Sequence, residues 1–265
     1  VSGTEESFTF DLLLDSGPGT SGIRLSLLDY PGGWIDPARR PEEREKDWES
    51  CKSWIRDSSV LIVPVESAVM MEADSAYRRR AVPSILNTHD VGEVSRDWAK
   101  ERTRKNTEPA LLIFCPVKCE SYFSDNGGLN DKSKILRECF QDHYLDVLKA
   151  VKGEAPHVNV LYAPVDTIGC VEIVQAHWKK DEANPSELIF TADYRVRRPN
   201  RQTVKGADAV LISLCQHLIE AQKKVEEFSA TELDNKAKEA KDFAEEDNGF
   251  FGNIWLWLSR ERNRR

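Results

Sequence analysis

Short apolar runs separated by longer polar, helix-forming stretches dominate much of the chain. The run at 59–65 (SVLIVPV) is short, apolar and rich in β-branched residues, which is typical of a strand buried on both faces, and the apolar run at 109–116 (PALLIFCP) predicts another buried strand. Residues 157–163 (HVNVLYA) are predicted to form the next strand. Residues 75–104 are mostly helical in composition, and apolar residues at helical spacing predict a helix over 134–151. Strands and helices that alternate in this way predict a mainly parallel sheet with helices on its faces.

The segment before these runs has a different pattern. Residues 7–14 and 23–29 flank a polar, glycine-rich turn, which predicts an antiparallel hairpin. Three further elements are expected: a helix over 42–55, a β insertion at 188–195 and a helix over 208–228. The predicted fold is therefore α/β, with three layers, a mainly parallel sheet and one antiparallel edge hairpin.

Composition narrows the class of protein. The 265 residues are 40% hydrophobic and include seven Trp, enough to bury a sizeable core. The net charge of −8 argues against nucleic-acid binding, which requires a dense basic surface. No apolar run approaches the ~20 residues of a membrane span, and no signal-peptide pattern opens the chain. The spacing of the six Cys matches no zinc site, so we expect free thiols and a cytoplasmic location.

The clearest candidate chemistry follows the second hairpin strand, in the run DYPGGW from Asp29 to Trp34. An Asp that leaves a buried strand can hold a magnesium ion, usually through water. Gly32, three residues later, allows a backbone N–H to approach a phosphate closely. Because turns often contain D-x-x-G, an ordinary turn is the alternative.

A second candidate follows the PALLIFCP strand, where Lys118 and Glu120 stand two residues apart. GTPases place a Lys and an Asp with this spacing at the end of the corresponding strand. The Lys stem lies over the base there, and the carboxylate accepts hydrogen bonds from guanine. Val165, after the next strand, stands where GTPases have a loop whose backbone N–H meets the guanine O6. A charged loop after a strand is the alternative for Lys118 and Glu120, and an ordinary loop for Val165.

These motifs carry a resemblance to a known family. DYPGGW resembles the D-Y-P-G-E-W signature of a bacterial group of TRAFAC-type GTPases that includes stress-related proteins and double-GTPase proteins of multi-gene systems. The runs PVKCE (116–120) and DTIG (166–169) are also similar to that group, and the resemblance covers residues 9–169. It implies a P-loop NTPase fold, binding of GTP or GDP with Mg²⁺, and a switch or hydrolase activity. The residues it implies in nucleotide binding are Asp29, Gly32, Lys118, Glu120 and Val165.

The sequence departs from this family at two points. No G-x-x-x-x-G-K-[ST] phosphate-binding loop occurs in the chain, which begins with Val1 just before the hairpin, so we expect that loop to lie upstream. Gly33 stands where the group has Glu and offers no side chain to orient water, which predicts slow GTP hydrolysis and leaves the catalytic residue unassigned. Thr4 is a candidate magnesium ligand, and a frayed terminus is its alternative.

We therefore predict a GTPase-like domain at 1–228, without its first strand and P-loop, and a helical C-terminal extension at 229–265. The leading hypothesis is a GTP-binding switch with protein partners in a larger bacterial system. A non-catalytic pseudo-GTPase that acts as an interaction module is the alternative, and a receiver-like or von Willebrand-like domain with metal on Asp29 is a third. The aromatic and basic tail has three interpretations: packing on the domain, docking of a partner, or peripheral contact with an anionic membrane.

Overall fold

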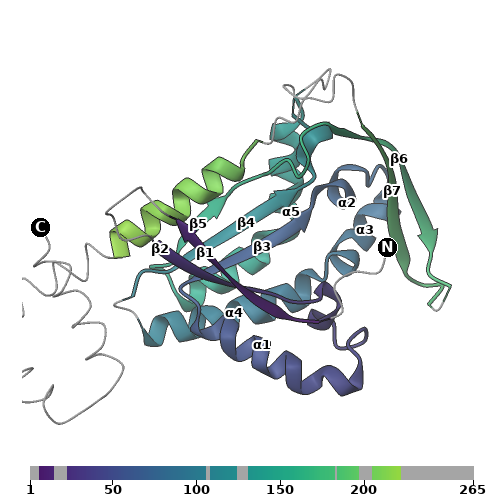
Figure 1. The fold of residues 1–265 in the computed structure, drawn as a ribbon. Helices are drawn as coiled ribbons and strands as arrows, with labels where there is room; N and C mark the ends of the chain where they lie inside the picture. The colour runs from purple at the N-terminus through teal and green to yellow at the C-terminus, as the bar shows by residue number, and fades with distance from the viewer. Residues whose placement is uncertain are drawn as a thin grey trace, which may run out of the picture. The chain divides into compact units, whose positions relative to one another are not determined.

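The chain forms a mixed α/β structure: a small three-stranded parallel sheet flanked by helices, plus two antiparallel hairpins (Figure 1). It divides into two compact units, residues 1–214 and 215–265. The domain boundary predicted after residue 228 lies outside the described residues and stays a prediction. The computed structural model describes residues 6–14, 23–105, 108–123, 131–182, 184–196 and 205–221.

The three apolar runs form the parallel sheet, as the sequence predicts. Its strands are β3 (Val60–Glu66), β4 (Leu111–Val117) and β5 (Asn159–Tyr162), in the order β3-β4-β5. The central strand β4 is buried along nearly its whole length, which explains its uninterrupted apolar sequence.

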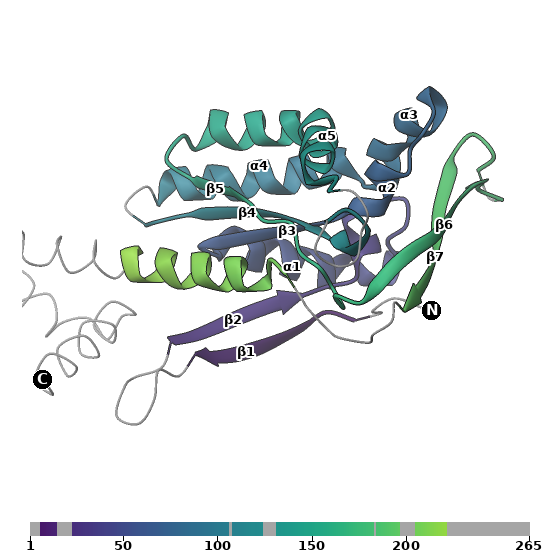
Figure 2. The same ribbon diagram turned by 90° about the horizontal axis from the view of Figure 1, so that it is seen from above.

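Helices cover both faces of this sheet. One face packs against α1 (Glu45–Asp57), α4 (Thr88–Arg104) and α5 (Ser133–Glu154), and Figure 2 shows α4 and α5 lying side by side. Side chains alternate along β4, so Leu112 and Phe114 enter this larger core. Leu111, Ile113 and Cys115 point to the other face, where they pack with Val210 and Leu214 of a helix over residues 207–221.

The predicted helical character of residues 75–104 is confirmed, and the stretch is divided in two. The stretch 75–104 forms two helices, α3 (Ala76–Ile85) and α4, with a break at Asn87. Asn87 has a left-handed backbone (φ 48°), which Asn adopts more readily than most residues. A short helix that the sequence did not indicate, α2 (Ser67–Met71), follows β3 directly.

The predicted N-terminal hairpin is confirmed as β1 (Phe8–Leu14) and β2 (Ile23–Asp29). Among the described strands, β2 pairs only with β1 and β3 only with β4, so hairpin and sheet form separate ladders. The Leu111 N–H donates to the Ser59 carbonyl, and peptide groups alternate along a strand, so Pro64 faces the side of β3 away from β4. We call this side the open edge of β3.

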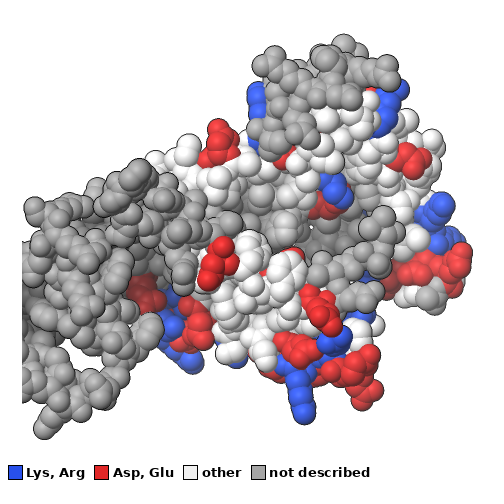
Figure 3. Space-filling model, viewed as in Figure 1, with Lys and Arg blue, Asp and Glu red and all other residues white. Residues whose placement is uncertain are grey.

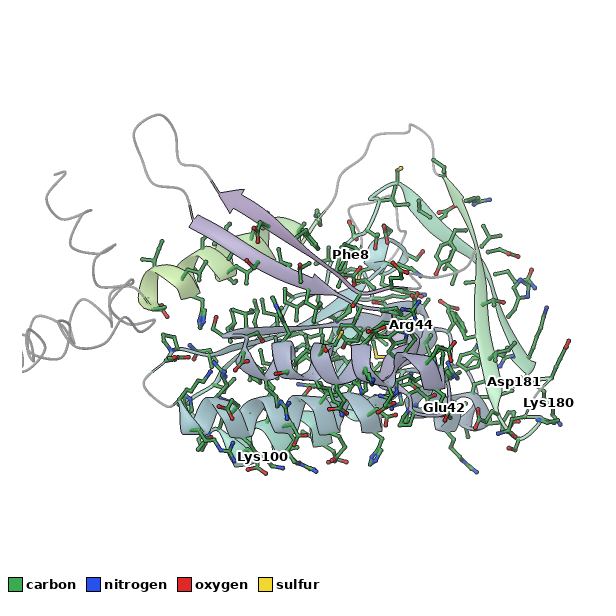
Figure 4. All side chains as sticks on the ribbon, turned by 60° about the horizontal axis from the view of Figure 1, so that its bottom comes forward. Phe8, Glu42, Arg44, Lys100, Lys180 and Asp181 are labelled. Carbon is green, nitrogen blue, oxygen red and sulfur yellow. The ribbon has the colours of Figure 1, made fainter. Side chains whose placement is uncertain are left out.

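The second hairpin consists of β6 (Val171–Lys180) and β7 (Leu188–Val196). The sequence predicted strand only in the β7 region. Trp178 and Phe190 face the larger core, and the Arg78 guanidinium lies 5.8 Å from the Trp178 ring centroid. Figure 4 shows Lys180 and Asp181 at the distal tip of this hairpin.

Candidate functional site

The candidate residues lie at strand ends on one side of the molecule. Figure 2 shows β2 pointing in the same direction as the parallel strands, so Asp29 lies on the side where β3, β4 and β5 end. The space-filling view shows the surface hollowed near the centre of one face, with charges of both signs at its margin (Figure 3). In open α/β sheets, ligands bind at the carboxyl ends of the strands.

The loop after β2 is anchored by its large residues and exposes its small ones. Pro31 and Trp34 are buried, and the Trp34 N–H closes the turn on the Pro31 carbonyl at 2.9 Å. Gly32 and Gly33 are exposed, and a Cβ built at either would meet no atom within 4 Å. The exposed Asp29 carboxylate and the glycine backbone are therefore presented outward, as a phosphate and a hydrated Mg²⁺ would require.

Tyr30 supplies a further anchor for this loop. Its ring lies 5.4 Å from that of Trp48 on α1. Burial, with smaller contributions from Cys51 and Asp29, raises the pKa of Tyr30 to about 12, so the phenol is neutral at physiological pH. The aromatic residues of DYPGGW thus hold the loop, while Asp29 and the glycines remain available.

Lys118 follows β4 in a strained conformation. It is one of two non-glycine residues with positive φ in the described part of the chain, at 58°. Its backbone N–H donates to Thr167 Oγ1 (3.0 Å), and its ammonium contacts Glu66 Oε2 (2.6 Å). The Tyr194 ring centroid lies 5.9 Å from the same ammonium. Backbone strain of this kind clusters at functional sites.

Glu120 is buried, with 4% of its surface exposed. Its Oε1 accepts three backbone hydrogen bonds, from Thr167 (2.8 Å), Ile168 (2.7 Å) and Gly169 (3.2 Å). The carboxylate therefore shapes the loop that follows β5. The predicted recognition of guanine by Glu120 stays a prediction, and the structure adds this second role.

The loop after β5 is also tied to the end of β4. The Val165 N–H donates to the Pro116 carbonyl (2.7 Å), and the Val165 carbonyl accepts from the Cys119 N–H (3.2 Å). A contact between this N–H and guanine O6 would require the bond to Pro116 to open. Val165 as a nucleotide-binding residue stays a prediction.

The far side of the same loop is closed by residues 205 and 206. The Asp166 N–H donates to the Lys205 carbonyl at 2.9 Å. Gly206 has φ +86°, and a Cβ at this position would lie 2.1 Å from the Pro164 carbonyl oxygen. Only glycine fits so close an approach in a left-handed conformation.

The Cys119 thiol beside the site is unreactive. All six cysteines are free, as predicted. Cys119 is buried with its Sγ 3.1 Å from Ser67 Oγ, and burial raises the pKa of its thiol to about 12. A thiol that stays protonated is a poor nucleophile, so Cys119 contributes packing rather than covalent chemistry.

No group of three His, Cys, Asp or Glu side chains gathers to hold a metal within the described part of the chain. Mg²⁺ bound with a nucleotide needs only one or two protein ligands beside phosphate oxygens and water, and Asp29 suits that role. The other candidate ligand, Thr4, lies outside the described residues, as does the tail at 229–265. None of the described helices is both long and apolar enough to cross a membrane.

Comparisons with protein-family models, curated proteins and solved structures found no match.

Two residues of the site escaped the sequence analysis. Glu66 directly follows the SVLIVPV run and is the last residue of β3. A charged residue at the carboxyl end of a predicted strand could have marked it as a candidate. Tyr194 had no such signal, because its position depends on the path of the β6–β7 hairpin. Thr167 lies in the DTIG run that carries the resemblance, but its contact with Lys118 was not foreseen.

Proposed function

We propose that residues 1–228 form a guanine-nucleotide-binding switch domain of the P-loop class that hydrolyses GTP slowly, within a multi-component bacterial system. The observation that carries the proposal is the strained Lys118 turn, whose neighbour Glu120 organises the loop after β5. This joins the ends of β4 and β5 into one rigid platform beside the Lys118 stem. The resemblance implies guanine binding at this location.

The Asp29 loop supports the phosphate end of the same proposal. Its exposed carboxylate would hold Mg²⁺ through water, and the Gly32 N–H would approach the terminal phosphate. Mg²⁺ would neutralise charge on the phosphate oxygens. Gly33 has no group to orient an attacking water, so unassisted hydrolysis would be slow.

The separate ladders of β2 and β3 support a missing phosphate-binding strand. A two-stranded hairpin is only marginally stable alone, and β3 has an open edge. We propose that a strand carrying the phosphate-binding loop fills the position between them.

A non-catalytic interaction module is the second candidate, and one observation favours it. Glu120 Oε1 already accepts three backbone N–H groups in a buried setting, so loop architecture alone accounts for this residue. Under this hypothesis the GTPase-like fold binds protein partners without turnover.

Calorimetry of the full-length protein with GTP, GDP and ATP in the presence of Mg²⁺ tests the proposal. We expect GTP and GDP to bind roughly ten- to hundredfold more tightly than ATP, because guanine N1–H and its 2-amino group can donate to a carboxylate, whereas adenine presents the N1 lone pair there. Asp29→Asn should abolish the effect of Mg²⁺ on GTP affinity. Asp11→Asn, in the same hairpin, is the matched control, because Asp11 contacts Ser26 instead.

Equal affinity for ATP and GTP would overturn the assignment of the base site. Phosphate release separates the two candidates, with ~10⁻⁴–10⁻² s⁻¹ expected for an unassisted GTPase. GTP binding without any phosphate release would favour the non-catalytic module.

A further inference from the structure

The Lys118 ammonium is held by groups from two distant elements. Glu66, at the end of β3, contacts Nζ through Oε2 at 2.6 Å. Tyr194, on β7, places its ring centroid 5.9 Å from Nζ, within the range of a cation–π contact. The Tyr194 hydroxyl also lies 3.5 Å from Glu66 Oε1, so the three side chains form a closed triangle.

The other end of the Lys118 side chain is equally constrained. The left-handed backbone sets the direction of its Cα–Cβ bond, and the hydrogen bond from its N–H to Thr167 Oγ1 holds that backbone. Lysine normally has a flexible four-carbon stem with high rotamer entropy. Contacts at both ends restrain this stem and preform it as an apolar surface.

We infer that Glu66 and Tyr194 are positioning residues for Lys118, which makes the β6–β7 hairpin part of the ligand site. The inference rests on the proposed function, in which a purine base lies against the Lys118 stem. Ordering the stem before the ligand arrives removes an entropic cost of binding. Tyr194 and Glu66 therefore act on affinity through Lys118 rather than by touching the ligand.

If Glu66 and Tyr194 served only to stabilise the fold, their substitution would mainly lower the stability of the protein. The Lys118 and Tyr194 side chains are well exposed, and exposed ion pairs contribute little to folding stability. As positioning residues, Glu66 and Tyr194 can be substituted with thermal unfolding nearly unchanged, and the substitution should alter the environment of the Lys118 amine.

The first experiment uses the 265-residue chain and requires no nucleotide. Acylation of each lysine by an N-hydroxysuccinimide ester at pH 8 is followed by peptide mass spectrometry. Glu66→Gln and Tyr194→Leu should each raise the labelling rate of Lys118 severalfold. Tyr194→Phe keeps the ring and should change it little. Asp193→Asn is the matched control, because Asp193 pairs with His177 instead.

The second experiment is a double-mutant cycle for GDP affinity in the full-length protein. Tyr194→Leu should weaken GDP binding about three- to tenfold, the cost of ordering one long side chain. In a Lys118→Ala background the same substitution should have no effect. Glu66→Gln should behave in the same way and is the milder variant if Tyr194→Leu reduces folding.

The outcomes separate this inference from the proposed function. Unchanged Lys118 labelling in both Glu66→Gln and Tyr194→Leu would overturn the positioning role, as would additive losses in the cycle. If Lys118 is labelled faster in these variants while the wild-type protein binds no guanine nucleotide, the positioning of Lys118 is upheld and the proposed function is overturned.

Discussion

Lys118 adopts a left-handed conformation that costs a residue with a Cβ about 1–2 kcal/mol. The hydrogen bond from its N–H to Thr167 Oγ1 holds the backbone in this conformation. At a residue under such strain, the usual order of stability of the Gly and Ala variants should be reversed.

Lys118→Gly should be more stable than Lys118→Ala by roughly 1 kcal/mol, because glycine adopts positive φ without steric cost. Urea unfolding of both variants measures the difference. Lys100 is the matched control, since it is exposed within α4, four residues before that helix ends, and points outward (Figure 4). There the order should reverse, with Gly about 1 kcal/mol less stable than Ala. If the Ala variant were the more stable one at both Lys118 and Lys100, the strain assigned to Lys118 would be contradicted.

His143 on α5 makes stability depend on pH. Burial lowers the pKa of this imidazole, and Asp142 partly offsets the effect. The unfolded chain therefore binds a proton more readily, so the unfolding free energy should fall as pH drops below about 6.5. Urea unfolding between pH 5 and 7.5 tests this, and His143→Gln should flatten that part of the profile. His89→Gln, at an exposed position of α4, should leave the profile unchanged.

Residue types and spacing predict Asp29, Lys118 and Glu120 as site residues, and the structure puts all three at strand ends on one side of the molecule. Spacing did not indicate that Glu120 would be buried. That burial depends on backbone N–H groups 47 to 49 residues later in the chain, which no local pattern encodes.

At the scale of elements, secondary structure was predicted correctly where the apolar pattern is uninterrupted, and it was missed where polar residues interrupt that pattern. The apolar runs form β3, β4 and β5, and β4 needs no alternation because it is buried on both faces. The β6 strand was missed because its sequence VEIVQAHWKK mixes polar and apolar residues on a hairpin that is largely exposed. The break between α3 and α4 depends on a single left-handed Asn87.

The connection from β7 into the helix at 207–221 depends on Gly206. Gly206→Ala should destabilise the protein by roughly 2–4 kcal/mol, because a Cβ would collide with the Pro164 carbonyl at positive φ. Gly153→Ala is the matched control, since nothing lies within 4 Å of that position in α5, and it should stabilise by about 0.5–1 kcal/mol. Thermal unfolding of both variants measures the contrast. A neutral Gly206→Ala would show that the loop after β5 relaxes easily.

For the whole of residues 1–214, stability should be unevenly distributed. Strand β4 is buried almost throughout, whereas the β1–β2 hairpin leaves Phe8 and Phe10 nearly half exposed. Hydrogen exchange followed by mass spectrometry should give the hairpin amides protection at least about a hundredfold lower than that of β4. The β6–β7 hairpin should be intermediate, because Trp178 and Phe190 anchor it to the larger core. Equal protection of β1–β2 and β4 would contradict this ranking.

The open edge of β3 also bears on self-association. The strand VLIVPVE is apolar and β-branched, a composition that favours edge-to-edge pairing and fibril growth between copies. Pro64 interrupts the row of N–H donors along that edge, since proline has none to offer. The same proline still presents a carbonyl, so one added strand in suitable register can bind while repetitive stacking is discouraged. Replacement of Pro64 by Val would restore a full row of donors and should make the purified chain prone to aggregation.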